Sequence, residues 1–142
     1  MKASESRYSS CVYFSSAAFA RKVEKIAVES WKPVGLSPSH GYLLMNVIDE
    51  PGIQPGALAG QLQLKPSTIT RFIEKLEEKK LLIRTTDGKL TNVYPTPKAK
   101  EMKAGLKKCV QDFDETCSGF FGKDEMKKFV SMLNKMSDKV KE

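Results

Sequence analysis

Residues 65–80 (KPSTITRFIEKLEEKK) place hydroxyl groups and one guanidinium on a single side of an expected helix. At 100° per residue, an apolar face centred on Ile69 points inward and leaves the opposite side free of bulky apolar groups. A planar guanidinium can donate to guanine O6 and N7 together, and short hydroxyl side chains allow close approach to base edges or phosphates. The inward positions are Ile69, Phe72, Ile73, Leu76 and Lys80; the opposite ones are Ser67, Arg71, Glu74, Lys75 and Glu78, with Thr68 and Thr70 on the flanks.

The segment before this helix favours DNA binding over an ordinary solvated amphipathic helix, which would show the same spacing. Residues 55–64 (PGALAGQLQL) predict a short helix with a tight connection to the next one, and two such helices form a helix-turn-helix. Pro66 suits the first turn of the second helix because a missing N–H costs nothing there. Lys65 is a poor cap, so Ser67 is the alternative cap.

The segment after the helix predicts a β-hairpin. Residues 82–86 and 89–94 are rich in strand-forming side chains, and Asp87-Gly88 separates them. An Asp-Gly pair between two such runs is a strong hairpin signal. A helix-turn-helix followed by a hairpin is a winged helix, with Lys89 at the tip of the wing. The expected fold class is therefore mainly α with a small β-hairpin wing.

In this order and spacing, the segments resemble the MarR family of bacterial and archaeal winged-helix transcription regulators. The matching pieces are Leu36-Ser37-Pro38, Leu58-Ala59 to Leu62, Ser67 to Arg71, Leu76-Glu77 and Leu81 to Arg84. The wing pattern of the family is Asp-x-Arg, an apolar residue, then Leu-Thr-x-x-Gly; here it reads Asp87, Lys89, Val93, Pro95, Thr96 and Ala99. Lys89 thus stands in place of an arginine and Ala99 in place of a glycine. The resemblance implies one domain over residues 1–142, with a winged helix-turn-helix at 37–96.

Length and composition place the chain among globular proteins. A chain of 142 residues with 40% hydrophobic content supports one domain with a core. No run approaches the roughly 20 apolar residues of a membrane span, and no signal-peptide core follows the first residues. We therefore expect a cytoplasmic protein without membrane partners. Three cysteines without metal or disulfide spacing fit a reducing compartment.

The net charge of +7 is concentrated in one part of the chain. Residues 65–108 hold 12 Lys or Arg against 5 Asp or Glu, whereas the remainder holds 12 of each. The excess therefore lies on the expected recognition helix, the wing and the start of the next helix. A localised excess favours a surface that faces phosphates over one that only aids solubility.

The two ends of the chain predict a helical dimerisation region formed by residues 5–31 and 98–141. Residues 5–31 show apolar positions at intervals of three and four, with apolar side chains on more than one side. A long helix is expected over residues 98–118, a turn between Gly119 and Gly122, and a last helix beyond it. The last helix has an apolar stripe at Met126, Phe129, Val130, Leu133, Met136 and Val140. Interleaving of these helices in a two-fold homodimer would bury the stripes.

These features predict a homodimer whose two recognition helices enter successive major grooves of a pseudo-palindromic duplex, about 10 bp apart. Arg71 is the first candidate for base reading. Ser67, Thr68 and Thr70 are candidates for base edges or phosphates, and Lys75, Arg84 and Lys89 for phosphates. No cofactor or metal is expected.

The sequence does not name an effector. By resemblance, the protein is a ligand-responsive repressor, and a small aromatic or hydrophobic effector occupies the crevice beside the dimer helices. His40, the only histidine, is interpreted as a partly exposed helix residue, with effector contact as the alternative. Cys11 resembles the reactive cysteine of the peroxide-sensing branch, but Lys25 and Pro38 replace the tyrosines of that branch, so a buried structural cysteine is the favoured interpretation.

The residues do not favour an enzyme, and they leave one other class of binding function open. The chain contains no paired nucleophile and base and no glycine-rich phosphate loop, so an enzyme is not expected. A winged helix that serves as a protein or RNA interaction module stays open, because the fold alone does not determine function.

Overall fold

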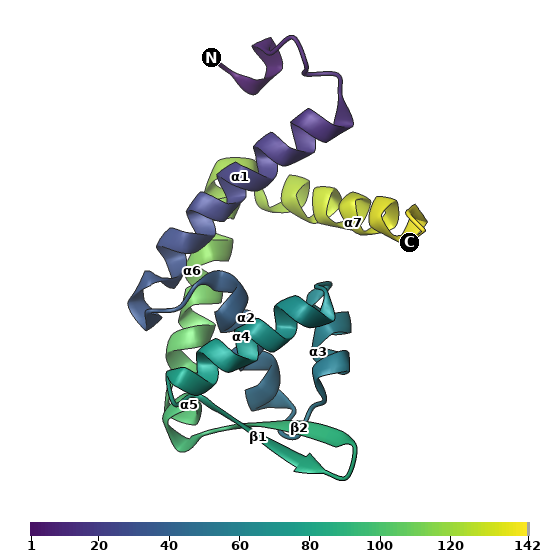
Figure 1. Cartoon of the computed structure of the whole chain (residues 1–142). Coiled ribbons are helices and arrows are strands. Elements are labelled where there is room, and N and C mark those ends of the chain that lie inside the picture. Colours follow the sequence, from purple (N-terminus) through teal and green to yellow (C-terminus); the bar gives the residue numbers. More distant parts are fainter. Residues whose placement is uncertain (142) are drawn as a thin grey trace. The chain divides into compact units, whose positions relative to one another are not determined.

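The computed structural model describes residues 1–141 and consists of helices and one antiparallel hairpin (Figure 1). This confirms the predicted fold class. The elements are η1 (Ala3–Glu5), α1 (Val12–Trp31), η2 (Lys32–Val34), α2 (Pro38–Asp49), α3 (Pro55–Leu62), α4 (Pro66–Glu78), β1 (Leu82–Asp87), β2 (Leu90–Pro95), α5 (Pro97–Glu101), α6 (Lys103–Phe121) and α7 (Lys123–Lys139).

The chain divides into two compact units. One, here called the winged unit, is Trp31–Cys109; the other, the terminal unit, combines Met1–Ser30 with the chain from Val110 onward. The core of the winged unit is formed where α2, α3, α4 and β2 pack together. Its fully buried side chains include Trp31, Leu43, Leu44, Val47, Leu58, Ile69, Ile73, Leu76 and Val93.

Helix α4 begins at Pro66 and ends at Glu78. Its cap is Lys65, which makes no side-chain cap hydrogen bond, so the alternative of Ser67 as the cap is wrong. At the other end Lys80 has φ +63°, and the N–H of Leu81 donates to Leu76 O at 2.9 Å. The helix thus stops in a left-handed residue, and the prediction that Lys80 faces inward is wrong because its side chain is exposed.

Strands β1 and β2 pair antiparallel from Leu82↔Pro95 to Asp87↔Leu90. The two-residue turn is therefore Gly88-Lys89, one position later than the predicted Asp87-Gly88. Gly88 has φ +64°, a conformation that glycine adopts without a steric penalty. The base of the hairpin is anchored by an isolated bridge between Ile53 and Val93.

The helices at the two ends of the chain differ in detail from the prediction. A first helix was expected over residues 5–31, but α1 starts at Val12 and is preceded by η1 and turns. The long helix expected over residues 98–118 is interrupted at Met102 and then runs to Phe121, through Gly119. Helix α7 contains no buried residue, although its apolar stripe is present as predicted.

Two further properties concern residues 1–141 only. None of the helices in this range is both long and apolar enough to cross a membrane. No group of three or more His, Cys, Asp or Glu side chains in this range is arranged to hold a metal ion.

Candidate nucleic-acid interface

The outer face of α4 is exposed over a fully packed inner face. Ile69, Ile73 and Leu76 are at most 1% exposed. On the other side Ser67 and Arg71 are exposed, and so are Thr70, Glu74, Lys75 and Glu78. Because the inner residues are held by the core, the helix presents its outer side chains from a rigid support.

Two of the predicted hydroxyl contacts are less free than the sequence suggests. The Thr70 hydroxyl donates to Pro66 O at 3.1 Å, one turn back in its own helix. In this rotamer Thr70 offers only acceptor lone pairs to a partner. Thr68 is half-buried. Ser67 and Arg71 are therefore the most accessible pair near the start of the helix.

Arg84, predicted to contact phosphate, forms an ion pair within the chain. Its Nη2 lies 2.8 Å from Oε1 of Glu77, at the C-terminal end of α4. The pair joins the end of the recognition helix to the first strand of the wing. This partner cannot be recognised from the sequence, because the pairing depends on how the end of a helix meets a strand.

Lys75 has a looser partner. Its Nζ is 3.7 Å from Oε2 of Glu78, three residues along α4, and 58% of the Lys75 side chain is exposed. An exposed pair of this kind stabilises by at most about 1 kcal/mol, so Lys75 can exchange Glu78 for a phosphate at little cost.

The wing tip carries the second accessible cation. Lys89 lies in the turn beside Gly88 and is exposed. Its neighbours Asp87 and Leu90 close the ladder of the hairpin. The tip is thus held by backbone pairing while its ammonium extends into solvent.

Backbone acceptors at the end of α4 are bound by the segment that follows the wing. The Thr96 hydroxyl donates to Lys80 O at 2.8 Å, and Lys98 Nζ donates to Lys79 O at 3.2 Å. These contacts, here called the α4–α5 clamp, hold the recognition helix against the start of α5. Thr96 also caps α5 by accepting from the N–H of Ala99 at 3.2 Å. The Thr96-Pro97 pair is a sequence signal for a helix start, but it does not predict the clamp.

His40 packs against the recognition helix. Its ring lies edge-on to Phe72, with centroids 4.5 Å apart and planes at 84°. Burial lowers the pKa of His40 below its ordinary value, and the charges of Lys79 and Lys75 lower this pKa further. The imidazole is therefore held in its neutral form. Its half-buried position agrees with the prediction of a partly exposed helix residue.

Cys11 is exposed, so its interpretation as a buried structural cysteine is wrong; Cys109 and Cys117 are the buried ones. Burial and the neighbouring Asp114 raise the pKa of the Cys117 thiol, which keeps it protonated.

The sequence model of the MarR family matches residues 36–89, which contain α2, α3, α4 and the first strand and turn of the wing. Over these residues the chain matches the pattern of the MarR family. The HTH-type transcriptional repressor MdtR of Bacillus subtilis (strain 168) is 26% identical to this chain over 78 residues. That match covers 55% of this chain and 50% of the length of MdtR, so it spans only about half of the relative.

Solved structures share the fold over nearly the whole length. The transcriptional repressor CouR bound to p-coumaroyl-CoA superposes with a TM-score of 0.85 at 20% identity, covering 96% of this chain and 98% of CouR. CouR bound to a 23-mer DNA duplex superposes with a TM-score of 0.82 at 20% identity, over the same shares of the two chains. At these identities the likeness establishes the fold. The descriptions of these relatives give no support to redox sensing through Cys11.

Proposed function

We propose that the protein is a transcriptional regulator that binds double-stranded DNA sequence-specifically, with α4 in the major groove. The observation that carries the proposal is the exposed Ser67 and Arg71 on a helix whose other face is buried in the core. The segment around this helix also holds the whole positive excess of the chain. CouR, which has a similar fold, is known in a structure bound to a 23-mer DNA duplex, and this supports the proposal of duplex binding. The place of action is the cytoplasm, where bacterial and archaeal DNA lies.

Within this proposal the side chains divide into base readers and phosphate anchors. Arg71 reads guanine, because its fork can donate to O6 and N7 from the exposed face of α4. Ser67 and the acceptor oxygen of Thr70 lie near base edges, and Thr68 lies beside the backbone. Lys75 and Lys89 bind phosphates. Arg84 contributes as a neutralised pair with Glu77, so its contact with phosphate requires opening of that ion pair.

The proposed active form is a homodimer joined through the terminal unit. Helix α7 has no buried residue, and an apolar groove of about 640 Å³ lies between α1 and α7. Phe129, Leu133 and Met136 line it and are 40%, 43% and 55% exposed. A contiguous exposed apolar surface of this kind marks an interaction site. A second copy fits because two-fold symmetry pairs the same apolar helix with itself.

A two-fold dimer determines the form of the target. Two copies of α4 related by the dimer axis would read a pseudo-palindrome with half-sites about 10 bp apart. The wings would reach the flanking backbone or minor groove through Lys89. We further propose that the protein is a repressor released by a small aromatic or hydrophobic effector, as the relatives' descriptions as repressors and the ligand-bound form of CouR suggest.

The deciding experiment combines target recovery with salt dependence. Fragments of the native genome that the protein retains would be sequenced, and binding to the recovered site would be measured by fluorescence anisotropy from 50 to about 200 mM salt. We expect one palindromic sequence, and affinity that falls by a factor of about 10³ or more with salt for six or more phosphate contacts. Equal, salt-insensitive retention of all duplexes, or a preference for RNA, would refute the proposal.

Two variants separate reading from anchoring. Arg71→Ala should cost about 1 to 3 kcal/mol on the recovered site and relax the preference at one base pair, whereas Lys89→Ala should weaken all duplexes alike. Lys127→Ala on α7 is the matched control, because it removes the same charge outside the proposed DNA interface and outside the lining of the apolar groove. Equal loss on specific and random duplex for Arg71→Ala would show that Arg71 binds backbone only.

A further inference from the structure

More than half of the positive excess lies beyond the recognition helix and the tip of the wing. Residues 65–89 hold 7 Lys or Arg against 4 Asp or Glu, a net charge of +3. Residues 90–108 hold 5 lysines against one carboxylate, that of Glu101, a net charge of +4. None of these lysines has a place in the contacts assigned above to DNA. They are Lys98, Lys100, Lys103, Lys107 and Lys108, here called the α5–α6 lysine surface.

The lysine surface lies on a firmly packed part of the winged unit. All five lysines are exposed. Between them in the sequence, Ala99, Leu106 and Cys109 are at most 2% exposed. Because these small and apolar side chains are held in the core, the lysines project from a backbone whose position is fixed.

Most of the ammonium groups for which a partner is known are held loosely. Lys103 Nζ is 4.0 Å from Oδ1 of Asp49, and the two side chains are 50% and 69% exposed. Such an exposed pair is worth at most about 1 kcal/mol, so Lys103 can exchange its partner for another anion. Within residues 1–141, Lys100 and Lys107 form no ion pair.

The lysine surface is continuous with the proposed DNA interface. Lys98 Nζ donates to Lys79 O at 3.2 Å, so the first lysine of the surface touches the end of α4. Lys79 and Lys80, at that end, are exposed as well. Figure 1 shows α5 beside the end of α4 and the base of the wing. A duplex held by α4 therefore has a further basic surface next to it.

The chemistry of the surface favours a nucleic-acid backbone over a protein partner. Residues 97–108 contain no aromatic side chain and no arginine, which are the usual anchors of protein interfaces, whereas lysine is depleted there. Lysines act as point charges that suit phosphates. Lys100 and Lys107 are separated by about 10 Å along the helix at 1.5 Å per residue, which is roughly the axial length of three phosphates of one DNA strand.

We propose that the α5–α6 lysine surface binds phosphates of duplex DNA outside the base pairs that α4 and the wing contact. The contact lengthens the bound duplex and adds affinity, but it does not change the preference for bases, because phosphates carry no sequence information. The inference rests on the proposed function, since α4 must first hold the duplex.

The test compares two duplexes by fluorescence anisotropy with the full chain. The short duplex is the recovered palindrome, trimmed to the shortest length on which the wild type keeps its base preference. The long duplex carries about one further helical turn, roughly 10 bp, of unrelated sequence at each end. Lys100→Gln/Lys107→Gln removes two charges and keeps the helix propensity. It should weaken binding of the long duplex about three- to tenfold and leave binding of the short duplex unchanged. The slope of log affinity against log salt on the long duplex should become shallower by about 2.

A second double variant controls for the loss of charge. Lys127→Gln/Lys135→Gln removes two exposed lysines of α7 and should bind both duplexes as the wild type does. Three results would overturn the inference: an unchanged affinity of Lys100→Gln/Lys107→Gln for the long duplex, an equal loss on the short and the long duplex, or an equal loss in the two double variants. A wild type that binds neither duplex would refute the proposed function. A wild type that binds the short duplex and gains nothing from the added ends would refute this inference alone.

An acidic protein is the competing partner for a lysine surface, and poly-L-glutamate is the probe for it. We expect poly-L-glutamate to bind the wild type and Lys100→Gln/Lys107→Gln with the same affinity. Binding of poly-L-glutamate that is lost in this variant, together with unchanged binding of the long duplex, would assign the surface to an acidic protein and overturn the inference.

Discussion

Helices α4 and α7 carry the same kind of apolar stripe but satisfy it in different ways. In α4, Ile69 and Leu76 are fully buried by the other elements of the winged unit. In α7, Leu133 and Met136 remain 43% and 55% exposed, and no residue of the helix is buried. The stripe of α4 is therefore covered within its own chain, whereas the stripe of α7 stays partly exposed and is the face assigned to the proposed second copy. The periodicity of a stripe shows that a face will be covered, but it does not show by which molecule.

The largest expected effect is on the free energy of unfolding, and it should distinguish the buried face of α4 from the exposed face of α7. Leu76→Ala should lower the free energy of unfolding by about 2 to 5 kcal/mol at every protein concentration, because it opens a cavity in a filled core. Leu133→Ala should instead act mainly through the proposed dimer, since 43% of Leu133 is exposed in the single chain and left for the second copy to cover. Denaturant unfolding at several concentrations would measure both. A concentration-independent loss of similar size for Leu133→Ala would break the comparison.

Glycines in the two units sharpen the contrast in packing. A Cβ at Gly41 would overlap the Trp31 ring, whereas a Cβ at Gly119 meets nothing within 4 Å. Gly41→Ala should therefore destabilise by about 1 to 3 kcal/mol through overpacking. Gly119→Ala, at an exposed position inside α6, should stabilise by roughly 0.5 to 1 kcal/mol because alanine is the better helix former. Thermal unfolding followed by far-UV circular dichroism would measure both changes. A neutral Gly41→Ala would mean that the ring of Trp31 is free to shift.

A smaller gain is expected at the end of the recognition helix. Lys80 occupies the left-handed region with φ +63°, which costs a non-glycine residue roughly 1 to 2 kcal/mol. Lys80→Gly should relieve this strain and stabilise the winged unit by about 0.5 to 1 kcal/mol after its own entropy cost. Lys79→Gly, at a neighbouring position with φ −80°, is the control and should destabilise. A destabilised Lys80→Gly would show that the Lys80 side chain contributes contacts that outweigh the strain.

The smallest effect concerns the contact between α2 and α4. Because the pKa of His40 is lowered in the folded chain, the unfolded chain binds the proton first as the pH falls below about 6.5. The contribution of His40 to stability is therefore complete above that pH and is lost as the pH falls through the folded-state pKa. Unfolding of the wild type and His40→Phe at pH 7.5, 6.5 and 5.5 would measure it. The two should diverge only at the acidic end; parallel behaviour would show that the neutral ring is not favoured.

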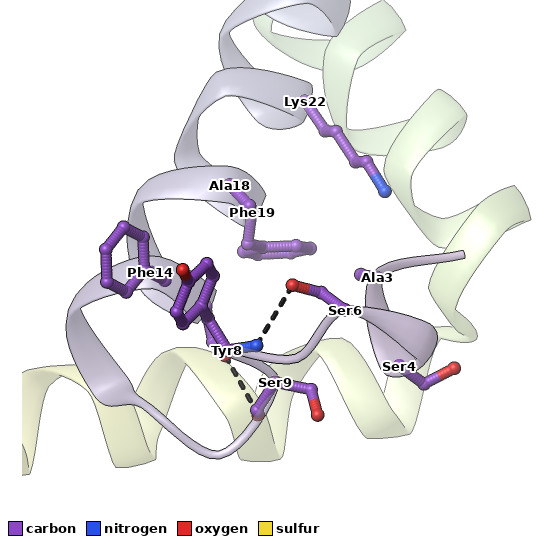
Figure 2. Close-up of a pocket in the computed structure, with 10 residues that line it drawn as sticks. Ala3, Ser4, Ser6, Tyr8, Ser9, Phe14, Ala18, Phe19 and Lys22 are labelled. Carbon is purple, nitrogen blue, oxygen red and sulfur yellow. Dashed lines mark hydrogen bonds between the residues drawn. The ribbon is translucent and has the colours of Figure 1, made fainter. Parts of the chain in front are cut away.

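The winged unit was predictable because its signals are local. The stripe of α4, Pro66 at its first position and the Gly88 turn each act within a few residues of the chain. The start of α1 was not predictable in the same way. Residues 5–11 continue the apolar spacing of a helix, yet the Ser6 hydroxyl accepts from the Tyr8 N–H (Figure 2) and the Ser15 hydroxyl donates to the Ser9 carbonyl. These side-chain hydrogen bonds compete with helical ones, so the helix begins at Val12.

The sequence predicted which face of α4 is exposed, but it did not predict which side chains on or near that face already have partners within the chain. Exposure of Ser67, Arg71 and Lys75 follows from the burial of Ile69 and its neighbours. Whether a cation is available to DNA depends on contacts between elements, such as Arg84 with Glu77 across a helix end and a strand. The donation of the Thr70 hydroxyl to its own helix is a choice of rotamer, which residue type alone does not determine.

The α4–α5 clamp has a consequence for how target spacing can change. The carbonyls of Lys79 and Lys80 are held by Lys98 and Thr96, and Ile53 fixes the base of the hairpin to Val93. We therefore expect α4, the wing and the start of α5 to move together as one rigid body. An effector that alters the proposed dimer would change the distance between the two α4 helices. Each winged unit would keep its own structure and its own base preference.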